Sequence, residues 1–201
     1  MLRVGLTGGI ACGKSAVAAM MRKRGCAVLD ADSLAHDLIE PGQPAHADIV
    51  REFGAGVLNA DGKVNRTTLG GIVFADRAKL ERLNQIVHPR VLQATEEWFE
   101  KTARDESAAI AVVEAALLIE AGYDKQLDRM VVCWCHPEQQ RKRLLSRGLD
   151  AAEAERRISA QMPMEEKKKR ATDLIDCSRT KAETGQQVDE LIARLQNLAA
   201  G

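Results

Sequence analysis

Short apolar runs alternate along this chain with amphipathic stretches, and this pattern predicts its secondary structure. Apolar runs predict β-strands at 3–7, 27–30, 109–113, 128–134 and 174–176. After the first run, Val17, Met20 and Met21 recur with the spacing of one helix face. Strands that alternate with helices in this way are typical of an α/β fold with a parallel sheet.

Turn and cap residues set the expected ends of the helices. A helix is predicted from about Lys14 to Arg24, with Gly25 beyond its basic last turn, where an achiral residue is favoured. Pro137 is expected to open another helix behind the fourth apolar run. A C-terminal helix is predicted over about 184–198.

Two segments do not fit a simple alternation and predict the domain organisation. The segment between the second and third strands is too long for a crossover connection, so an inserted helical substrate lobe is expected at about 40–105. The segment at about 138–170 has no regular pattern and holds more Lys and Arg than Asp and Glu, which predicts a basic lid. The rest forms the core of a single domain spanning 1–201, at about 1–39, 106–137 and 171–201.

Composition narrows the class of protein. At about 150 residues per domain, 201 residues suit one domain with an insertion. The 29 Lys and Arg balance 29 Asp and Glu, and aromatic residues make up 3%, so a nucleic-acid partner is not expected. No apolar run approaches the roughly 20 residues of a membrane span, and no signal segment is visible, so no membrane partner is expected either.

Cysteine usage points to a reducing compartment. The chain has 5 cysteines and no C-x-x-C pair. An odd number without metal-ligand spacing fits reduced thiols better than a disulfide framework or a zinc site. We therefore expect a cytoplasmic protein, and the absence of a heptad or apolar stripe suggests a monomer or a weak homo-oligomer.

The strongest motif is the segment 8–15, which matches G-x-x-x-x-G-K-[ST]. Its glycines let backbone N–H groups turn toward a phosphate, and the helix that follows adds its N-terminal dipole. Lys14 is expected to reach the β- and γ-phosphates of a nucleotide, and the Ser15 hydroxyl to ligate Mg²⁺. A strand before the motif and a helix after it complete the context of a phosphate-binding loop.

A phosphate-binding loop leaves the reaction open, because GTPases, motor ATPases and small-molecule kinases share it. The sequence has no Asn-Lys-x-Asp and no Asp followed by Gly three positions later, so the usual guanine and γ-phosphate signals of GTPases are missing. A small-molecule kinase is favoured. A kinase for a nucleotide or another small acceptor, and a nucleotide-dependent switch without phosphorylated product, stay open as alternatives.

Carboxylates follow two of the predicted strands. Asp30 and Asp32 come after the second strand and Glu114 after the third, where side chains face the ligand of an open α/β sheet. One can hold Mg²⁺ through water, for which Glu114 is a candidate, and another can accept a proton from a substrate hydroxyl. A helix-capping role for Asp30 and Asp32 stays open.

The basic segment offers a candidate clamp for the transferred group. Arg143 and Arg147 have the i, i+4 spacing of one helix face, so both are expected to face the phosphate-binding loop and neutralise the moving phosphoryl group. Lys168 and Lys169 are expected on a solvated helix face.

Taken together, these residues resemble the dephospho-coenzyme A kinase family. The matching segments include Leu6-Thr7-Gly8-Gly9-Ile10, Asp30-Ala31-Asp32, Val64-Asn65-Arg66, His88-Pro89, Leu117-Leu118-Ile119-Glu120 and Gln161-Met162-Pro163. The resemblance implies a P-loop kinase-like three-layer fold, with ATP phosphorylating the 3′-hydroxyl of the dephospho-coenzyme A ribose in the last step of coenzyme A biosynthesis.

The resemblance also implies roles for particular residues. Asp32 matches the proposed general base, which also binds the substrate, and the other catalytic residues are Lys14, Arg143 and Arg147. Arg66 and His88 fall in the lobe that binds the acceptor. The implied ATP-binding residues are Gly8, Gly9, Ala11, Cys12, Gly13, Lys14, Ser15, Ala16 and Arg147. From the residues alone, His88-Pro89 could instead be a turn at the start of a helix, and Arg66 a solvated side chain.

Departures from the family pattern affect the nucleotide site. Ala11-Cys12 stands where the family has Gly-Ser, which is expected to place a thiol beside the nucleotide. Cys177 and Arg179 differ from the usual residues near the expected adenine pocket, which bears on the preference for ATP over GTP.

Overall fold

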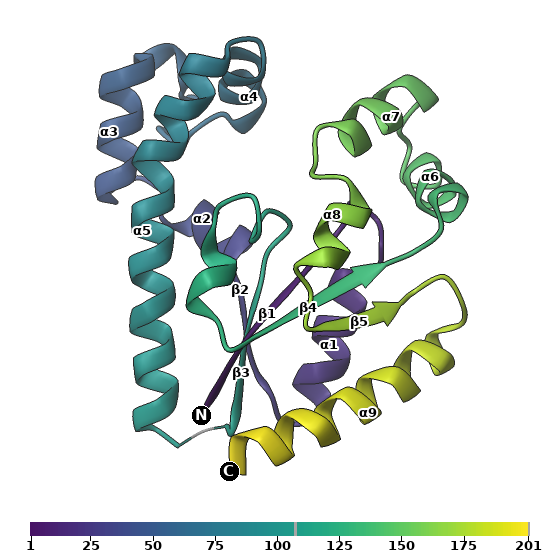
Figure 1. Cartoon of the computed structure of the whole chain (residues 1–201). Coiled ribbons are helices and arrows are strands. Elements are labelled where there is room, and N and C mark those ends of the chain that lie inside the picture. The colour runs from purple at the N-terminus through teal and green to yellow at the C-terminus, as the bar shows by residue number, and fades with distance from the viewer. Residues whose placement is uncertain (107, 201) are drawn as a thin grey trace. The chain divides into compact units, whose positions relative to one another are not determined.

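The five strands of this chain form a parallel sheet that matches the predicted α/β fold (Figure 1). The structure is a computed structural model that describes residues 1–106 and 108–200. Within these residues the strand order is β2-β3-β1-β4-β5, and every neighbouring pair is parallel. The strands are β1 (Leu2–Gly8), β2 (Ala27–Asp30), β3 (Ile110–Glu114), β4 (Arg129–Trp134) and β5 (Asp173–Asp176). Each lies within one or two residues of its predicted run.

Helices connect the strands, as the alternating pattern predicts. They are α1 (Lys14–Lys23), α2 (Ala31–Asp37), α3 (Pro44–Phe53), α4 (Arg66–Phe74), α5 (Arg77–Arg104), α6 (Pro137–Leu145), α7 (Ala151–Ser159), α8 (Met164–Lys169) and α9 (Lys181–Ala200), with short 3₁₀ turns at Ala55–Val57 and Tyr123–Gln126. Gly25 follows α1 with φ 88°, in the left-handed region that favours glycine. Pro137 opens α6, as predicted. The segment 138–170, expected to be irregular, holds most of α6 together with α7 and α8.

Strand pairing aligns the carboxyl ends of the central strands. Leu6 of β1 pairs with Glu114 of β3, and Gly8 pairs with Cys133 of β4. A Cβ at Gly8 would lie 2.4 Å from the carbonyl oxygen of Cys133, so this position needs glycine. The phosphate-binding motif therefore begins where the sheet ends.

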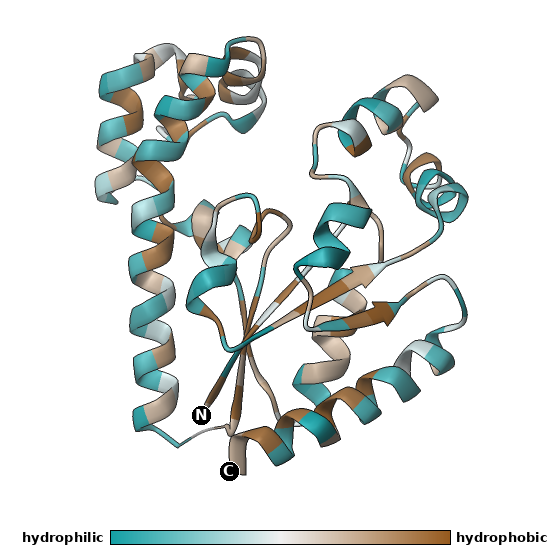
Figure 2. Cartoon of the chain, in the orientation of Figure 1, coloured by the Kyte–Doolittle hydropathy of each residue, from teal (hydrophilic) through white to brown (hydrophobic). Residues whose placement is uncertain are grey.

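Apolar residues of the sheet and of two helices form the main core. The strands are largely hydrophobic along their length, whereas α9 alternates hydrophobic and hydrophilic positions (Figure 2). Val17 and Met21 of α1 pack with Val188 and Leu191 of α9, all fully buried, in one cluster with β1 residues such as Leu6. Burial of these faces stabilises the sheet, because each buried aliphatic side chain contributes about 1.5–3 kcal/mol of transfer free energy.

The described chain packs into two compact units. One comprises Met1–Asp30 and Phe99–Gly201, and the other Ala31–Trp98. The second unit has its own buried core of α3, α4 and α5 residues, among them Ile49, Val73 and Ile86. It overlaps the expected lobe at about 40–105 but begins earlier, with α2. None of the helices formed by the described residues is long and apolar enough to cross a membrane.

Candidate active site

The phosphate-binding loop joins β1 to α1 and bends through two residues with positive φ. Ala11 has φ 59° and Gly13 has φ 96°, and the amide of Cys12 donates to the carbonyl of Gly9 at 3.0 Å. A Cβ on Gly13 would lie 2.9 Å from Cys177 Cβ, so the loop needs glycine here. Among the described residues, no side chain caps the N-terminus of α1. The first turn of α1 thus presents its backbone N–H groups without a capping side chain, which favours binding of an anion.

Lys14 and Glu114 form an ion pair at the base of this loop. Lys14 Nζ donates to Glu114 Oε1 at 3.0 Å, and the two side chains are 14% and 4% exposed. Ser15 is exposed on the first turn of α1. A hydroxyl and a carboxylate oxygen are the ligand types that a hard cation such as Mg²⁺ prefers. The residues at this end of the sheet therefore fit a magnesium ion.

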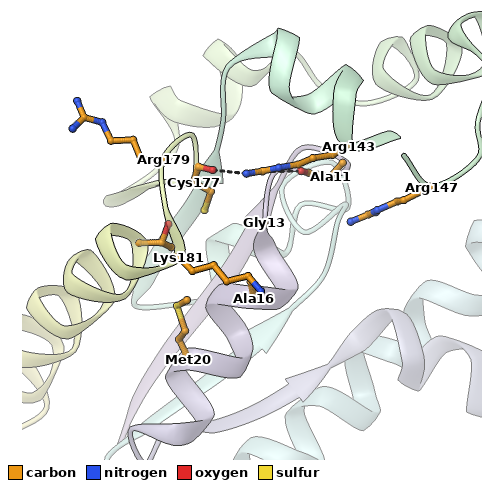
Figure 3. A pocket seen from close by; sticks show the side chains of 10 residues that line it. Ala11, Gly13, Ala16, Met20, Arg143, Arg147, Cys177, Arg179 and Lys181 are labelled. Carbon is orange, nitrogen blue, oxygen red and sulfur yellow. Dashed lines mark hydrogen bonds between the residues drawn. The ribbon is translucent and has the colours of Figure 1, made fainter. Parts of the chain in front are cut away.

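A cavity of about 260 Å³ lies beside the loop (Figure 3). Its lining comes from the phosphate-binding loop, α1, α6 and the turn after it, the segment after β5 and the start of α9. The lining residues are Ala11, Gly13, Ala16, Met20, Arg143, Arg147, Cys177, Arg179, Lys181 and Thr184. Four of the implied ATP-binding residues (Ala11, Gly13, Ala16 and Arg147) thus meet at one hollow, which is lined by cationic side chains.

Arg143 uses its guanidinium to hold two loops. Nη1 donates to the carbonyl of Ala11 at 3.1 Å and Nη2 donates to the carbonyl of Cys177 at 2.7 Å. Figure 3 shows the side chain extended between these two carbonyls. Arg143 therefore ties the phosphate-binding loop to the segment after β5, a role that the sequence did not suggest.

Arg147 does not lie on the same helix as Arg143, contrary to the prediction. Helix α6 ends at Leu145, and the amide of Arg147 donates to the carbonyl of Leu144 in a turn that leads to Gly148, at φ 87°. The i, i+4 spacing therefore crosses a helix end. Both arginines still line the cavity, because the turn keeps Arg147 at its edge.

The thiol of Cys12 is fully buried, whereas the sequence led us to expect it beside the nucleotide. Its sulfur accepts a hydrogen bond from the Cys135 thiol at 3.4 Å. This bond lowers the pKa of Cys12 to about 7, against an opposing effect of burial. The cysteine of the cavity wall is Cys177.

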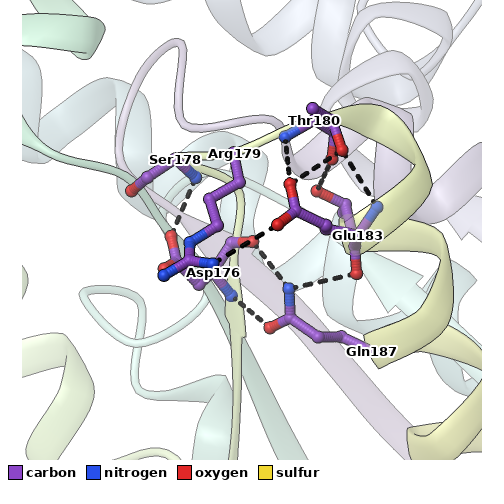
Figure 4. A network of polar contacts seen from close by, with 7 residues as sticks. Asp176, Ser178, Arg179, Thr180, Glu183 and Gln187 are labelled. Atoms are coloured by element: carbon purple, nitrogen blue, oxygen red, sulfur yellow. Dashed lines mark hydrogen bonds and ion pairs between the residues drawn. The ribbon is translucent and has the colours of Figure 1, made fainter.

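Polar contacts fix the segment between β5 and α9 (Figure 4). Gln187 of α9 accepts from the amide of Asp176 at 2.9 Å and donates to its carbonyl at 2.9 Å. Glu183 accepts from the amide of Thr180 at 3.0 Å and pairs with Arg179 at 3.3 Å. The guanidinium of Arg179 thus points away from the rest of the cavity lining in Figure 3.

Three predicted site residues belong to the second compact unit. Asp32 lies in the first turn of α2 and is exposed. Arg66 opens α4 and is exposed beside Asn65, which caps this helix by accepting from Thr68 N. His88 lies inside α5, where burial lowers its pKa. The alternative of a turn at a helix start is therefore wrong for His88, because α5 continues through Pro89.

Comparison with known proteins decides among the kinases that share this loop. A family model described as Dephospho-CoA kinase matches residues 2–183. The chain belongs to the dephospho-CoA kinase family. A protein of Symbiobacterium thermophilum named Dephospho-CoA kinase is 47% identical over 174 residues, which cover 86% of this chain and 72% of that protein.

Two further members support this family assignment. The Dephospho-CoA kinase of Geobacter sulfurreducens is 42% identical over 192 residues, which cover 95% of this chain and 97% of that protein. The solved structure of a dephospho-CoA kinase from Campylobacter jejuni superposes with a TM-score of 0.72 at 26% identity and covers 97% of each chain. Membership of the dephospho-CoA kinase family makes this chain a kinase, with ATP as the phosphoryl donor and a small molecule as the substrate.

Further side chains contact the phosphate-binding loop or lie buried near it, and the sequence pattern gave them no role. Gln140 and Gln161 contact the main chain of Ile10, and Lys167 is fully buried. Gln161 belongs to a segment that matches the family, so the sequence marked it as a candidate. Its contact with the amide of Ile10 could not be read from the sequence. Lys167 has lysines on its C-terminal side at Lys168 and Lys169, and nothing in this run indicates which of them is buried.

Proposed function

We propose that this chain transfers the γ-phosphoryl group of ATP to the 3′-hydroxyl of the dephospho-CoA ribose, which gives coenzyme A and ADP. The observation that carries the proposal is a match to the dephospho-CoA kinase family over residues 2–183 in a chain with an intact phosphate-binding loop. The family match names the acceptor, and the loop supplies the site for the donor.

The loop and its lysine are proposed to bind the phosphates of ATP. The first-turn N–H groups of α1 surround the β-phosphate. The ammonium group of Lys14, which pairs with Glu114, turns toward the β- and γ-phosphates. Ser15 would hold Mg²⁺, with Glu114 as a ligand through water. When bound, the ion neutralises charge that builds up between the β- and γ-phosphates.

The chemical step is proposed to be an in-line transfer that needs a base and a clamp. Asp32 accepts the proton of the 3′-hydroxyl as that oxygen attacks the γ-phosphorus. Arg147 stabilises charge on the moving phosphoryl group, and Arg143 adds its charge from a position fixed by Ala11 and Cys177. Arg66 and His88 are proposed to position the acceptor in the lobe at about 40–105.

We propose that the core carries the phosphate-binding loop and that a lid closes over the bound phosphates. The core comprises about 1–39, 106–137 and 171–201, and the lid about 138–170. A basic lid over the phosphates excludes water, which protects ATP from hydrolysis before the acceptor binds. We propose a cytoplasmic location because the described cysteines are free thiols. The balanced charge supports the absence of a nucleic-acid partner, and a monomer or weak homo-oligomer is proposed.

The test is mass-spectrometric detection of product after incubation with Mg-ATP and dephospho-CoA. We expect a species heavier by one phosphoryl group, formed about 10²- to 10⁴-fold more slowly by Asp32→Asn, which still binds ATP. Asp37→Asn, on the same exposed helix, serves as the control with normal turnover. Formation of ADP without the heavier species contradicts the acceptor, and an unchanged rate in Asp32→Asn contradicts the base.

A further inference from the structure

The phosphate-binding loop holds a conformation that its own sequence disfavours. Ala11 has φ 59°, and a residue with a Cβ is rarely stable in this left-handed region without outside support. Ala11 packs with Leu144 and Ala154 in a small buried cluster, whereas the main chain of Ile10 and Ala11 still needs polar partners. Hydrogen bonds from elsewhere in the chain supply the support.

Three side chains from the segment 140–161 bind the main chain at Ile10 and Ala11. Gln161 Oε1 accepts from the amide of Ile10 at 2.7 Å, and Gln140 Nε2 donates to the carbonyl of Ile10 at 2.8 Å. Arg143 donates to the carbonyl of Ala11 at 3.1 Å. Gln140 and Arg143 lie on α6, whereas Gln161 comes from the turn between α7 and α8 and binds the loop from a different element.

An ion pair between the buried Lys167 and the solvent-accessible Glu120 holds the turn that carries Gln161. The amide of Met162 donates to Glu120 Oε1 at 3.1 Å, and Lys167 Nζ contacts the same oxygen at 2.8 Å. Lys167 is fully buried and also donates to the carbonyl of Ala116 at 2.9 Å, which accepts from Thr7 Oγ1 at 3.1 Å. Thr7 directly precedes the loop, so one network joins the end of β1 to the turn.

We propose that Gln161 is a positioning residue that holds the phosphate-binding loop ready for the phosphates of the nucleotide. It can do so only while the turn between α7 and α8 is held by the hydrogen bond from Met162 to Glu120 and by the ion pair of Glu120 with Lys167. This inference rests on the proposed function, because it concerns how the same loop binds the donor. Gln161 makes its bond through the amide of Ile10 and is given no contact with the nucleotide.

The proposal separates binding of phosphates from binding of the base and of the acceptor. Without Gln161, the loop is disordered in part of the molecules. The apparent affinity for phosphates then falls in proportion to the fraction of molecules whose loop is ordered. The loss applies equally to any ligand held by the loop alone, such as inorganic tripolyphosphate. It does not apply to the acceptor, and the rate of the bound complex changes little because the filled loop is ordered by its ligand.

The test compares Gln161→Met, which keeps the length of the side chain and removes the acceptor, with Gln186→Met on the exposed face of α9. We expect the Kd of tripolyphosphate and the KM of ATP to rise about tenfold in Gln161→Met, as for the loss of one hydrogen bond. The kcat and the KM of dephospho-CoA stay within about twofold, and the melting temperature within about 3 °C. Gln186→Met behaves as wild type.

Several results overturn the proposal. An unchanged Kd of tripolyphosphate in folded Gln161→Met does so, as does an equal rise in the KM of both substrates. Should this variant not fold, amide exchange in the wild type decides: slow exchange at Ile10 without ligand supports the bond to Gln161, and fast exchange refutes it. A wild type that bound neither ATP nor tripolyphosphate would refute the proposed function itself, and this inference with it.

Discussion

At the scale of single residues, the ion pair of Lys14 and Glu114 links catalysis to stability. The carboxylate of Glu114 is 4% exposed and lies 3.0 Å from Lys14 Nζ. Removal of one partner from an ion pair at this depth leaves the other side chain buried without its charge partner, which is strongly destabilising. Glu114 therefore holds the side chain of Lys14 in place at the base of the phosphate-binding loop.

Lys14→Met is expected to abolish ATP binding and to lower the free energy of unfolding by about 3 kcal/mol, because Glu114 is left buried without its partner. The double variant Lys14→Met/Glu114→Gln is expected to regain most of this stability and none of the activity. Denaturant unfolding and ATP titration check both statements. Equal stability of the single and double variants contradicts the coupling.

The thiol pair of Cys12 and Cys135 makes stability depend on pH. The donated hydrogen bond lowers the pKa of Cys12 from 9.0 to about 7 in the folded protein. A group with a lowered folded pKa contributes stability above its unfolded pKa and loses it as the pH falls through the folded value. The contribution therefore grows between about pH 7 and pH 9.0.

Cys135→Ala is expected to remove this rise, because Cys12 then lacks the donor that favours its thiolate. The measurement is the free energy of unfolding of both proteins across the window from about pH 7 to pH 9.0. Cys26→Ala is the control, since burial raises the pKa of Cys26 to about 11 and this residue titrates outside the window. Parallel pH profiles for wild type and Cys135→Ala would contradict the prediction.

At the scale of elements, consecutive lysines of α8 differ in their exposure to solvent. Its last turn is a run of lysines. Lys167 points inward to Glu120 and Ala116, Lys168 lies over the ring of Trp134 at 4.0 Å, and Lys169 is exposed. The expectation of a solvated face fits Lys169, whereas Lys168 is partly covered.

Lys167→Met is expected to lower the free energy of unfolding by about 1–3 kcal/mol, because Glu120 and the carbonyl of Ala116 lose the charged donor that they share. Lys169→Met is the matched control on the same helix and should leave stability unchanged, since its pair with Glu166 is exposed. Thermal or denaturant unfolding measures both. The same loss of stability in the two variants would show that the burial of Lys167 contributes nothing.

At the scale of the whole molecule, donor residues and proposed acceptor residues fall into different compact units. The unit of Met1–Asp30 and Phe99–Gly201 contains the phosphate-binding loop, Glu114, Arg143 and Arg147, whereas the unit of Ala31–Trp98 contains Arg66 and His88. Each unit has a separate buried core. A ligand that binds one unit should therefore slow amide exchange mainly in that unit.

Hydrogen exchange is expected to show this separation. Mg-ATP alone should slow amide exchange at 8–17 and 176–184, around the loop and the cavity, because binding lowers the population of locally open states. Dephospho-CoA alone should slow exchange within Ala31–Trp98. Protection by the acceptor that is confined to the first unit would refute the assignment of Arg66 and His88.

The sequence by itself determined the fold class, the strand positions within one or two residues and the phosphate-binding loop. These depend on local periodicity and on backbone preferences of neighbouring residues, such as Gly13 before α1. The family segments then indicated the reaction. Local signals were sufficient because the phosphate-binding motif is contiguous in the chain.

Only the tertiary structure decided how particular side chains are used. The burial of Lys167, the hold of Gln161 on Ile10 and the pairing of Cys12 with Cys135 join residues far apart in the chain. Arg147 left the helix of Arg143 because α6 ends at Leu145. Such contacts depend on which surfaces meet after folding, so residues of the same type in the same run receive different roles.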